Sequence, residues 1–114
     1  MKFIGKEGDD FVGGFRRPQG VDIDQEGHVL VTDSRNDRIQ VFTPELHPLC
    51  FFGRPQLRLA TVDASLPTAA QATTNSHESG ATGSDVLDRP CDVAVALDGR
   101  VYVVDLGHNC VRVY

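Results

Sequence analysis

RPQGVDIDQEGHVLVTDSRNDRIQVF (residues 17–42) and RPCDVAVALDGRVYVVDLGHNCVRVY (residues 89–114) align without a gap at an offset of 72 residues. Eight of the 26 aligned pairs are identical: Arg17/Arg89, Pro18/Pro90, Val21/Val93, Gly27/Gly99, Val29/Val101, Val31/Val103, Asp33/Asp105 and Val41/Val113. The identities fall mainly on alternating apolar positions and on one turn glycine. Because self-similarity at a fixed spacing indicates a repeated structural unit, we predict two copies of one unit in this chain.

Each copy alternates apolar and polar residues with a period of two, which is typical of strands that bury one face. The apolar positions of the first copy are Val21, Ile23, Val29, Val31, Ile39 and Val41. Gly27 and Gly99 stand in the turn after the first strand of each copy. PLCFFG (residues 48–53) predicts a fourth strand, and no helical pattern of useful length occurs. The predicted fold class is therefore all-β, built from four-stranded antiparallel units.

Composition and charge limit the possible classes of function. The chain has 114 residues, which is the size of one domain. Its formal net charge of −5 argues against the general basic charge of non-specific nucleic-acid binders, although a local basic patch is compatible with it. No membrane-length apolar run occurs, and the N-terminus turns acidic before a signal-peptide core. Three cysteines without ligand spacing favour a reducing, cytoplasmic location.

Two segments lie outside the aligned copies. From residue 60 to residue 84, fifteen of 25 residues are Ala, Ser or Thr, and none is aromatic. Such a stretch buries too little apolar surface to offset the entropy of ordering, so residues 54–87 are predicted to be a disordered insertion loop. Near the start of the chain, the sequence Phe-Ile-Gly at residues 3–5 resembles Phe-Phe-Gly at residues 51–53. Residues 1–13 are therefore expected to be the outer strand of a preceding unit with its linker.

The pattern of these units resembles the NHL repeat. The residues that carry the resemblance are GFRRPQGVDIDQEGHVLVTDSRNDRIQVF (14–42) and LDRPCDVAVALDGRVYVVDLGHNCVRVY (87–114), with KFIG and PLCFFG beside them. The second copy is similar to the last repeat of tripartite-motif NHL proteins, although their usual Asn-His order is His108-Asn109 here. The resemblance divides the chain into NHL repeat 1 at residues 14–53 and NHL repeat 2 at residues 88–114, a last blade without its outer strand.

In that family the repeats are blades of a β-propeller, commonly about six of them, and this chain holds about two. Each blade buries its faces against its neighbours, so a two-blade chain leaves both of its outer faces uncovered. We therefore expect a C-terminal propeller fragment that is marginally stable or prone to aggregate alone. The remaining blades are expected either in cis or from a homo-oligomer.

Strand direction gathers several polar loop residues on one face of the predicted propeller. The loop between the second and third strands returns to the side where the first strand begins, and the insertion emerges there too. The residues expected on this face are Arg16, Arg17, Arg35, Asn36, Arg38, Arg89, His108 and Asn109. Arg, Asn and His side chains suit phosphate contacts and base-edge hydrogen bonds. In relatives, the loop-bearing face is implicated in binding single-stranded RNA or proteins.

A structural interpretation of the same residues stands beside this one. Four aspartates lie near these arginines in sequence: Asp33, Asp37, Asp88 and Asp105. The arginines can therefore simply form surface ion pairs, worth under about 1 kcal/mol each. Asp33 and Asp105 recur at the end of the second strand, where a carboxylate that accepts backbone N–H bonds in the following turn is expected. Together with Gly27 and Gly99, they are predicted to be structural turn residues.

No catalytic constellation, metal site or cofactor is predicted in this chain. The four histidines lack an H-E-x-x-H or similar ligand spacing, and no serine has a nucleophile-elbow context. Some NHL propellers are metal-dependent lyases that use histidines around the central channel. His28 and His108 are not at equivalent positions of the two copies, which makes a lyase a distant alternative. A membrane partner is not expected either.

The leading hypothesis for the function is a protein-interaction module. The resemblance implies a parent protein with a RING finger, zinc-binding B-boxes and E3 ubiquitin-ligase activity, in which this chain selects the ubiquitination substrate. Zinc is therefore expected only in such a parent. The alternative is a single-stranded RNA-binding propeller that acts in post-transcriptional repression.

Overall fold

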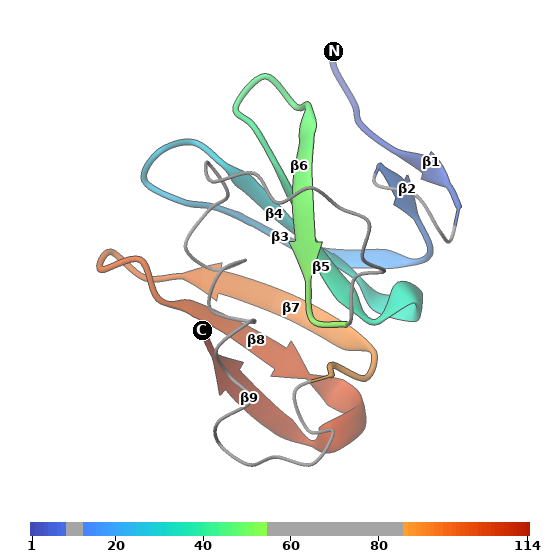
Figure 1. The fold of residues 1–114 in the computed structure, drawn as a ribbon, viewed down its shortest axis with the longest axis vertical. Helices are drawn as coiled ribbons and strands as arrows, with labels where there is room; N and C mark the ends of the chain where they lie inside the picture. Colours follow the sequence, from blue (N-terminus) through green and yellow to red (C-terminus); the bar gives the residue numbers. More distant parts are fainter. Residues whose placement is uncertain (9–12, 55–85) are drawn as a thin grey trace.

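A computed structural model describes residues 1–8, 13–54 and 86–114 (Figure 1). Its strands are β1 (Lys6–Glu7), β2 (Gly14–Phe15), β3 (Pro18–Ile23), β4 (Val29–Asp33), β5 (Arg38–Phe42), β6 (Pro48–Phe52), β7 (Pro90–Val95), β8 (Val101–Asp105) and β9 (Cys110–Val113). Short 3-10 helices, η1 (Ser34–Asn36) and η3 (Leu106–His108), follow β4 and β8. Nearly all of the insertion predicted at residues 54–87 lies outside the described residues.

Two antiparallel sheets correspond to the two sequence copies. Strands β3-β4-β5-β6 form a four-stranded sheet, here called blade 1, and β7-β8-β9 form a three-stranded sheet, here called blade 2. A separate parallel pair, β1-β2, precedes them. In the described residues no α-helix occurs, and no helix there has the length and apolar character to span a membrane. The all-β prediction is confirmed, and the antiparallel four- and three-stranded sheets agree with the predicted blades of an NHL-type propeller.

The alternating sequence fixes how the strands pair within each blade. In blade 1, Val21 pairs with Val31 and Ile23 with Val29 across β3 and β4, so β-branched residues stand opposite one another on one face. Gly27 closes the turn between these strands with φ of +89°, a backbone region that glycine adopts without a steric cost. Gly99 has φ of +93° in the equivalent turn of blade 2. The hairpins are therefore built by matching local means.

The same alternation gives each blade two faces, and the main core lies between the blades. We call the face of each blade that carries Val21 and Ile23, or their counterparts Val93 and Val95, the leading face, and the opposite face the trailing face. The trailing face of blade 1 packs on the leading face of blade 2 in one cluster that contains Leu30, Ile39, Val41, Cys50, Phe52, Leu87, Val93, Val101 and Val103. Phe52 and Tyr114 close its outer end, with ring centroids 4.9 Å apart. Burial of this apolar surface is the main force that joins the two blades.

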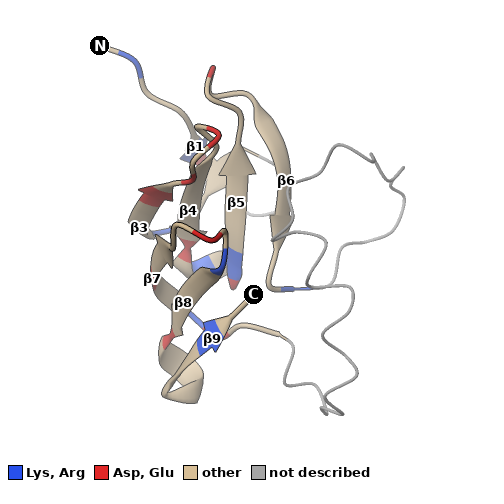
Figure 2. Cartoon of the chain, turned by 90° about the vertical axis from the view of Figure 1, so that its left-hand side faces the viewer, with Lys and Arg blue, Asp and Glu red and all other residues tan. Residues whose placement is uncertain are grey.

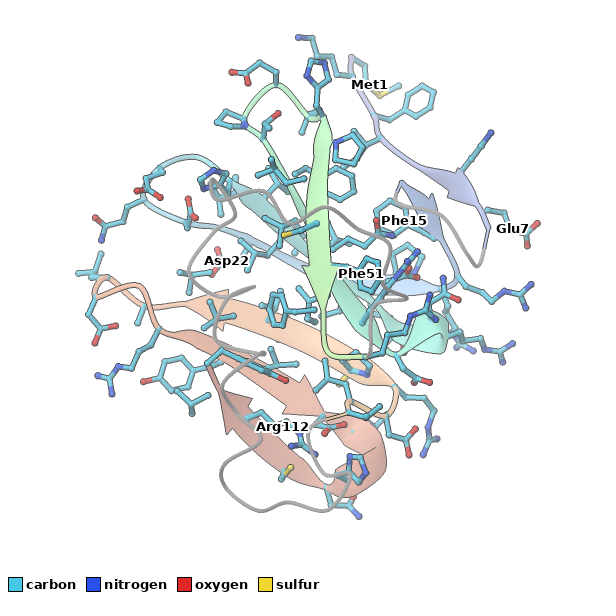
Figure 3. The ribbon with its side chains drawn as sticks, in the orientation of Figure 1. Met1, Glu7, Phe15, Asp22, Phe51 and Arg112 are labelled. Atoms are coloured by element: carbon cyan, nitrogen blue, oxygen red, sulfur yellow. The ribbon has the colours of Figure 1, made fainter. Side chains whose placement is uncertain are left out.

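Carboxylate groups of blade 1 also accept hydrogen bonds from backbone N–H groups of blade 2. The backbone N–H of Val95 donates to Asp22 Oδ2 at 2.7 Å, and that of Arg89 donates to Asp37 Oδ1 at 2.7 Å. In Figure 3, Asp22 lies between β3 and β7. These bonds fix how the blades are stacked, because each one links a side chain of one sheet to the backbone of the other.

The two outer faces are uncovered in the described residues, as expected for a chain of two blades. On the leading face of blade 1, Val21 is 61% and Ile23 58% exposed, whereas Val93, the counterpart of Val21, is 4% exposed. On the trailing face of blade 2, Val111 and Val113 are 58% and 53% exposed. The alternation is correct, but no other described element covers these faces.

Candidate functional site

The loop face is built from two matching pairs of segments. In blade 1, the N–H of Arg35 in η1 donates to the carbonyl oxygen of Arg16 at 3.0 Å. In blade 2, the N–H of Gly107 in η3 donates to the carbonyl oxygen of Asp88 at 2.7 Å. Each pair joins the turn after the second strand to the segment that enters the first strand. These segments therefore lie side by side at one end of each blade.

Left-handed backbone at equivalent positions shapes this face. Arg17 and Arg89 have φ of 61° and 54°, and Asp37 and Asn109 have φ of 54° and 55°. Non-glycine residues adopt this region at a cost of roughly 1–2 kcal/mol, which the surrounding hydrogen bonds offset. One such bond is that from the Arg89 N–H to Asp37. The bends consequently recur in both blades with nearly the same geometry.

Six of the eight residues expected on the loop face are exposed. They are Arg16, Arg17, Arg35, Arg89, His108 and Asn109. Arg89 forms an ion pair with Asp88, its Nε lying 3.0 Å from Oδ1, while Arg17 and Arg35 form no ion pair within the described residues. Figure 2 shows Asp and Glu positions interspersed among the Lys and Arg positions. Arg17 and Arg35 are thus exposed cations outside the ion pairs of the described residues, but the loop face is not purely basic.

Asn36 and Arg38 are not part of that surface, which corrects the expectation for both. The Arg38 side chain is 0% exposed, with Nε 2.8 Å from Asp33 Oδ2 and Nη2 2.9 Å from the carbonyl oxygen of Gly14. Asn36 donates from Nδ2 to the carbonyl oxygen of Gly8 at 3.0 Å and to Asp33 Oδ2 at 2.9 Å. Both residues are held inside the blade because Asp33, a buried carboxylate, requires donors.

Asp33 and Asp105 act as structural acceptors, but not in the turn where they were expected. Asp33 Oδ1 accepts the N–H of Arg16 at 2.6 Å, and Asp105 Oδ1 accepts the N–H of Asp88 at 2.8 Å. Neither carboxylate caps the 3-10 helix that follows it. Oδ1 of each carboxylate therefore accepts a backbone N–H of the segment that precedes the first strand, whereas Oδ2 contacts a side chain of the turn after the second strand, Asn36 in blade 1 and His108 in blade 2.

The second oxygen of Asp105 contacts one side chain of the loop face, His108, and one side chain of β9, Arg112. Arg112 Nε lies 2.5 Å and His108 Nδ1 2.8 Å from Asp105 Oδ2. Burial raises the pKa of Asp105, but its hydrogen bonds with Arg112, the Asp88 N–H and His108 outweigh burial, so its pKa is lowered below 3.8. His108, expected as a binding residue, thus also has a structural contact.

One group of possible ligands was missed in the sequence. The donor atoms of Asp24, Glu26 and His28 in the β3–β4 hairpin all lie within 4.8 Å of one another. Asp24 accepts the N–H groups of Glu26 and His28, and His28 Nδ1 lies 2.9 Å from Asp24 Oδ2. The spacing D-x-E-x-H was a signal for this group. These contacts account for its geometry as a hydrogen-bonded turn.

A cleft of about 660 Å³ lies between the β3–β4 and β7–β8 hairpins, and the sequence did not predict it. Its apolar lining residues include Leu30, Val41, Val101 and Tyr114, and its charged lining residues are Asp24, Glu26, Asp98 and Arg100. The hairpins stand at the other end of the strands from η1 and η3. The cleft is therefore separate from the loop face.

Comparison with known proteins identifies the repeat. Residues 15–42 match the family model of the NHL repeat. The chain is 66% identical to Protein lin-41 of Caenorhabditis elegans over 29 residues, which are 25% of this chain and 2% of that protein. It is 51% identical to E3 ubiquitin-protein ligase TRIM71 of Rattus norvegicus over 41 residues, which are 36% of this chain and 5% of that protein. Protein wech of Drosophila melanogaster is 59% identical over 29 residues, 25% of this chain and 4% of that protein.

These matches support the resemblance to the blades of NHL propellers. The matched stretches span a small part, 2–5%, of the length of these relatives. Repeat, sheets and relatives together support a propeller-type module for protein interaction.

Proposed function

We propose that this chain is the substrate-recruiting part of an NHL propeller whose parent is a cytoplasmic RING-type E3 ubiquitin ligase. The observation that carries the proposal is the 51% identity to E3 ubiquitin-protein ligase TRIM71 over 41 residues. In this proposal the chain supplies binding, and the ligase chemistry with its zinc belongs to other domains of the parent.

The loop face is the proposed binding surface. Arg17 and Arg35 are exposed, and hydrogen bonds hold the backbone around them. A guanidinium on a pre-organised backbone loses less conformational entropy on binding, and it matches a carboxylate with two parallel hydrogen bonds. We therefore expect an acidic segment of a protein substrate as the partner.

A competition experiment tests this proposal. The chain, expressed in excess beside the parent ligase, should occupy the substrate and lower its ubiquitination. Arg17→Glu with Arg35→Glu should abolish this competition, because both exposed cations are reversed. Arg100→Glu is the matched control, since Arg100 is an exposed arginine in the β7–β8 hairpin. Equal competition by all three proteins would exclude the loop face as the recruiting surface.

Single-stranded RNA is the second candidate, because the same arginines suit phosphate groups. Base stacking would need exposed aromatic rings, and the loop-face segments 13–17, 34–37, 86–89 and 106–109 offer Phe15, which is buried. Protein binding is therefore favoured. Titration with a single-stranded RNA pool at two salt concentrations separates the candidates: RNA binding that Arg17→Glu weakens, with a smaller salt dependence, would establish the alternative.

A further inference from the structure

The interface between the blades has an incomplete counterpart at the start of the chain. A second apolar cluster contains Phe15, Val31 and Phe42, with Ile4 and Val29 packed against it. Four residues of this cluster have counterparts 72 positions later: Leu87 for Phe15, Val103 for Val31, Tyr114 for Phe42 and Val101 for Val29. All four counterparts belong to the core between the blades or pack against it. The leading face of blade 1 thus repeats the leading face of blade 2, and among the described residues Ile4 is the part of the preceding segment that packs on it.

Residues 3–5 occupy the place of an outer-strand end within this counterpart. A Cβ atom on Gly5 would collide with Phe15, just as one on Gly53 would collide with Leu87, and Phe15 and Leu87 are equivalent positions. Gly5 and Gly53 also share positive φ, 96° and 105°. Ile4 therefore packs on blade 1 as Phe52 packs on blade 2. Residues 1–5 stand where the outer strand of a preceding blade would end.

Blade 2 lacks the outer strand that blade 1 has. Strand β5 pairs with both β4 and β6, whereas β9 pairs only with β8 in the described part of the chain. The trailing face of blade 2 is apolar and open, with Val111 58% and Val113 53% exposed. Their counterparts, Ile39 and Val41, are 0% exposed. Among the described residues, blade 2 thus has three strands, and residues 3–5 resemble the end of a fourth strand.

We propose that two copies of this chain dock head to tail, the trailing face of blade 2 in one copy packing on the leading face of blade 1 in the next. The N-terminal residues of the second copy then add to the free edge of β9 as its fourth strand. In blade 1, Phe52 pairs with Ile39 and Cys50 with Val41. The same register pairs Ile4 of the second copy with Val111, and Lys2 with Val113.

The polar contacts of the existing interface support this docking in part. Asp37 accepts the Arg89 N–H across the blades. Asn109 stands at the position of Asp37 in the same left-handed conformation, and Arg17 repeats the φ of Arg89, so Asn109 Oδ1 can accept the Arg17 N–H of the second copy. Ala94 replaces Asp22, so the bond that Val95 makes to Asp22 is not repeated. The contact between copies is therefore weaker than that between the blades.

Head-to-tail docking leaves a free face at each end of a dimer, so further copies can add, and a ring forms if the rotation closes. This property separates it from a two-fold contact, in which one face meets the same face of the partner. A variant with a disrupted leading face and a variant with a disrupted trailing face should each fail to associate with copies of itself. The two variants should associate with each other, because one has an intact trailing face and the other an intact leading face.

The mixing experiment uses Val21→Glu and Val111→Glu in the 114-residue chain. Light scattering on a sizing column should give wild type a mass of several 12.4 kDa chains and each variant the mass of one. An equimolar mixture should contain a dimer limited to two copies, because one intact contact remains. His47→Glu, an exposed turn residue, should leave the wild-type mass unchanged. Rescue on mixing also shows that the variants are folded.

A cysteine pair tests the register. Lys2→Cys in one chain and Val113→Cys in another, both with Cys91→Ser and Cys110→Ser, should form a disulfide between copies, because directly opposed strand residues have suitable Cα spacing. Cys50 can remain, since burial raises the pKa of its thiol to about 12. Phe3→Cys, one residue out of register, should cross-link several-fold less. Wild type that is monomeric at every concentration, or equal cross-linking of both pairs, would overturn the proposal and leave these faces to blades of a longer polypeptide.

Discussion

Blade 1 and blade 2 satisfy the same buried aspartate with different residues. Asp33 binds Nε of Arg38, the first residue of β5, whereas Asp105 binds Nε of Arg112, the third residue of β9. The residues at the exchanged positions are Gln40 and Cys110. The first and third residues of a strand point to the same face, so either position can deliver a guanidinium. Both copies thus place a cation on this face of the third strand, but not at one fixed position.

The two networks differ in how well they are covered. The Arg38 side chain is 0% exposed, whereas that of Arg112 is 21% exposed. The carbonyl oxygen of Gly14 accepts Arg38 Nη2 and Gln40 Nε2, and the Gly13 N–H donates to Gln40 Oε1. This entry segment, residues 13–17, therefore covers the hydrogen-bond network of Asp33 and Arg38 in blade 1. Burial of the charges, and not the choice of residues, should therefore decide how much each network contributes to stability.

The largest expected effect compares the closed interface with its open counterpart. Phe52→Ala removes an aromatic ring from the core between the blades and should lower the free energy of unfolding by about 3–5 kcal/mol. Ile4→Ala, at the matching place on the leading face of blade 1, should cost about 1 kcal/mol because Ile4 is only half-buried. Urea unfolding at one protein concentration measures both. Similar losses would show that the two interfaces are equally covered.

Second in size is the contrast between the two aspartates. Asp33→Asn places an amide against the buried Arg38 guanidinium and should cost about 3 kcal/mol, because a buried charge loses its counter-ion. Asp105→Asn should cost about 1 kcal/mol, because Arg112 can turn toward water. The midpoint of urea unfolding distinguishes them. A larger loss for Asp105→Asn would contradict the role of the entry segment.

A smaller effect tests whether the guanidinium can move along the strand. Arg38→Cys should destabilise blade 1, and adding Gln40→Arg should restore about 1 kcal/mol by recreating the arrangement of Asp105 and Arg112. The recovery should be partial, because Gln40 loses its bonds to Gly13 and Gly14. Gln40→Arg alone is the control and should destabilise. No recovery in the double variant would mean that the two networks are not interchangeable.

Much of this architecture followed from the sequence because it is a property of periodicity. Alternation predicts the strands, and the offset of 72 residues aligns Asp33 with Asp105. The buried position of Arg38 was not predictable from the sequence. Nearness in sequence suggested an exposed pair, whereas the hairpin brings Arg38 opposite Asp33 in the β4–β5 register, and the entry segment then covers both. That burial depends on a long-range contact, which neither period nor spacing encodes.

The exposure of Val21 agrees with the expectation that a two-blade chain leaves its outer faces uncovered. Alternation alone does not distinguish Val21 from Val93, since it is the same at both residues. Val93 is covered because blade 1 lies against it, and Val21 is exposed because no described element does so. The repeat therefore predicts which side chains are suited to a neighbour, but not whether the neighbour is present. The same holds for the cleft between the hairpins, which only the stacking of two blades creates.

The smallest expected effect is a pH dependence that belongs to blade 2. The pKa of Asp105 is lowered below 3.8 in the folded chain, since its hydrogen bonds with Arg112, the Asp88 N–H and His108 outweigh burial. At pH values between the folded and the unfolded pKa of Asp105, the unfolded chain binds more protons than the folded chain. The stability that Asp105 contributes is therefore present above its unfolded pKa and is lost as pH falls through its folded pKa. Urea midpoints measured from about pH 6 to about pH 3 should therefore fall, and less steeply in Asp105→Asn.

Asp24 provides the control for this titration. Its pKa is also lowered, because hydrogen bonds from His28 and from the Glu26 N–H outweigh its burial, so Asp24→Asn should flatten the same profile. The two effects should add in the double variant, because the β3–β4 hairpin and the loop face lie at opposite ends of the strands and share no partner. If Asp105→Asn leaves the slope unchanged while Asp24→Asn flattens it, then the acid sensitivity lies in the hairpin of blade 1 and the network of blade 2 is too exposed to contribute.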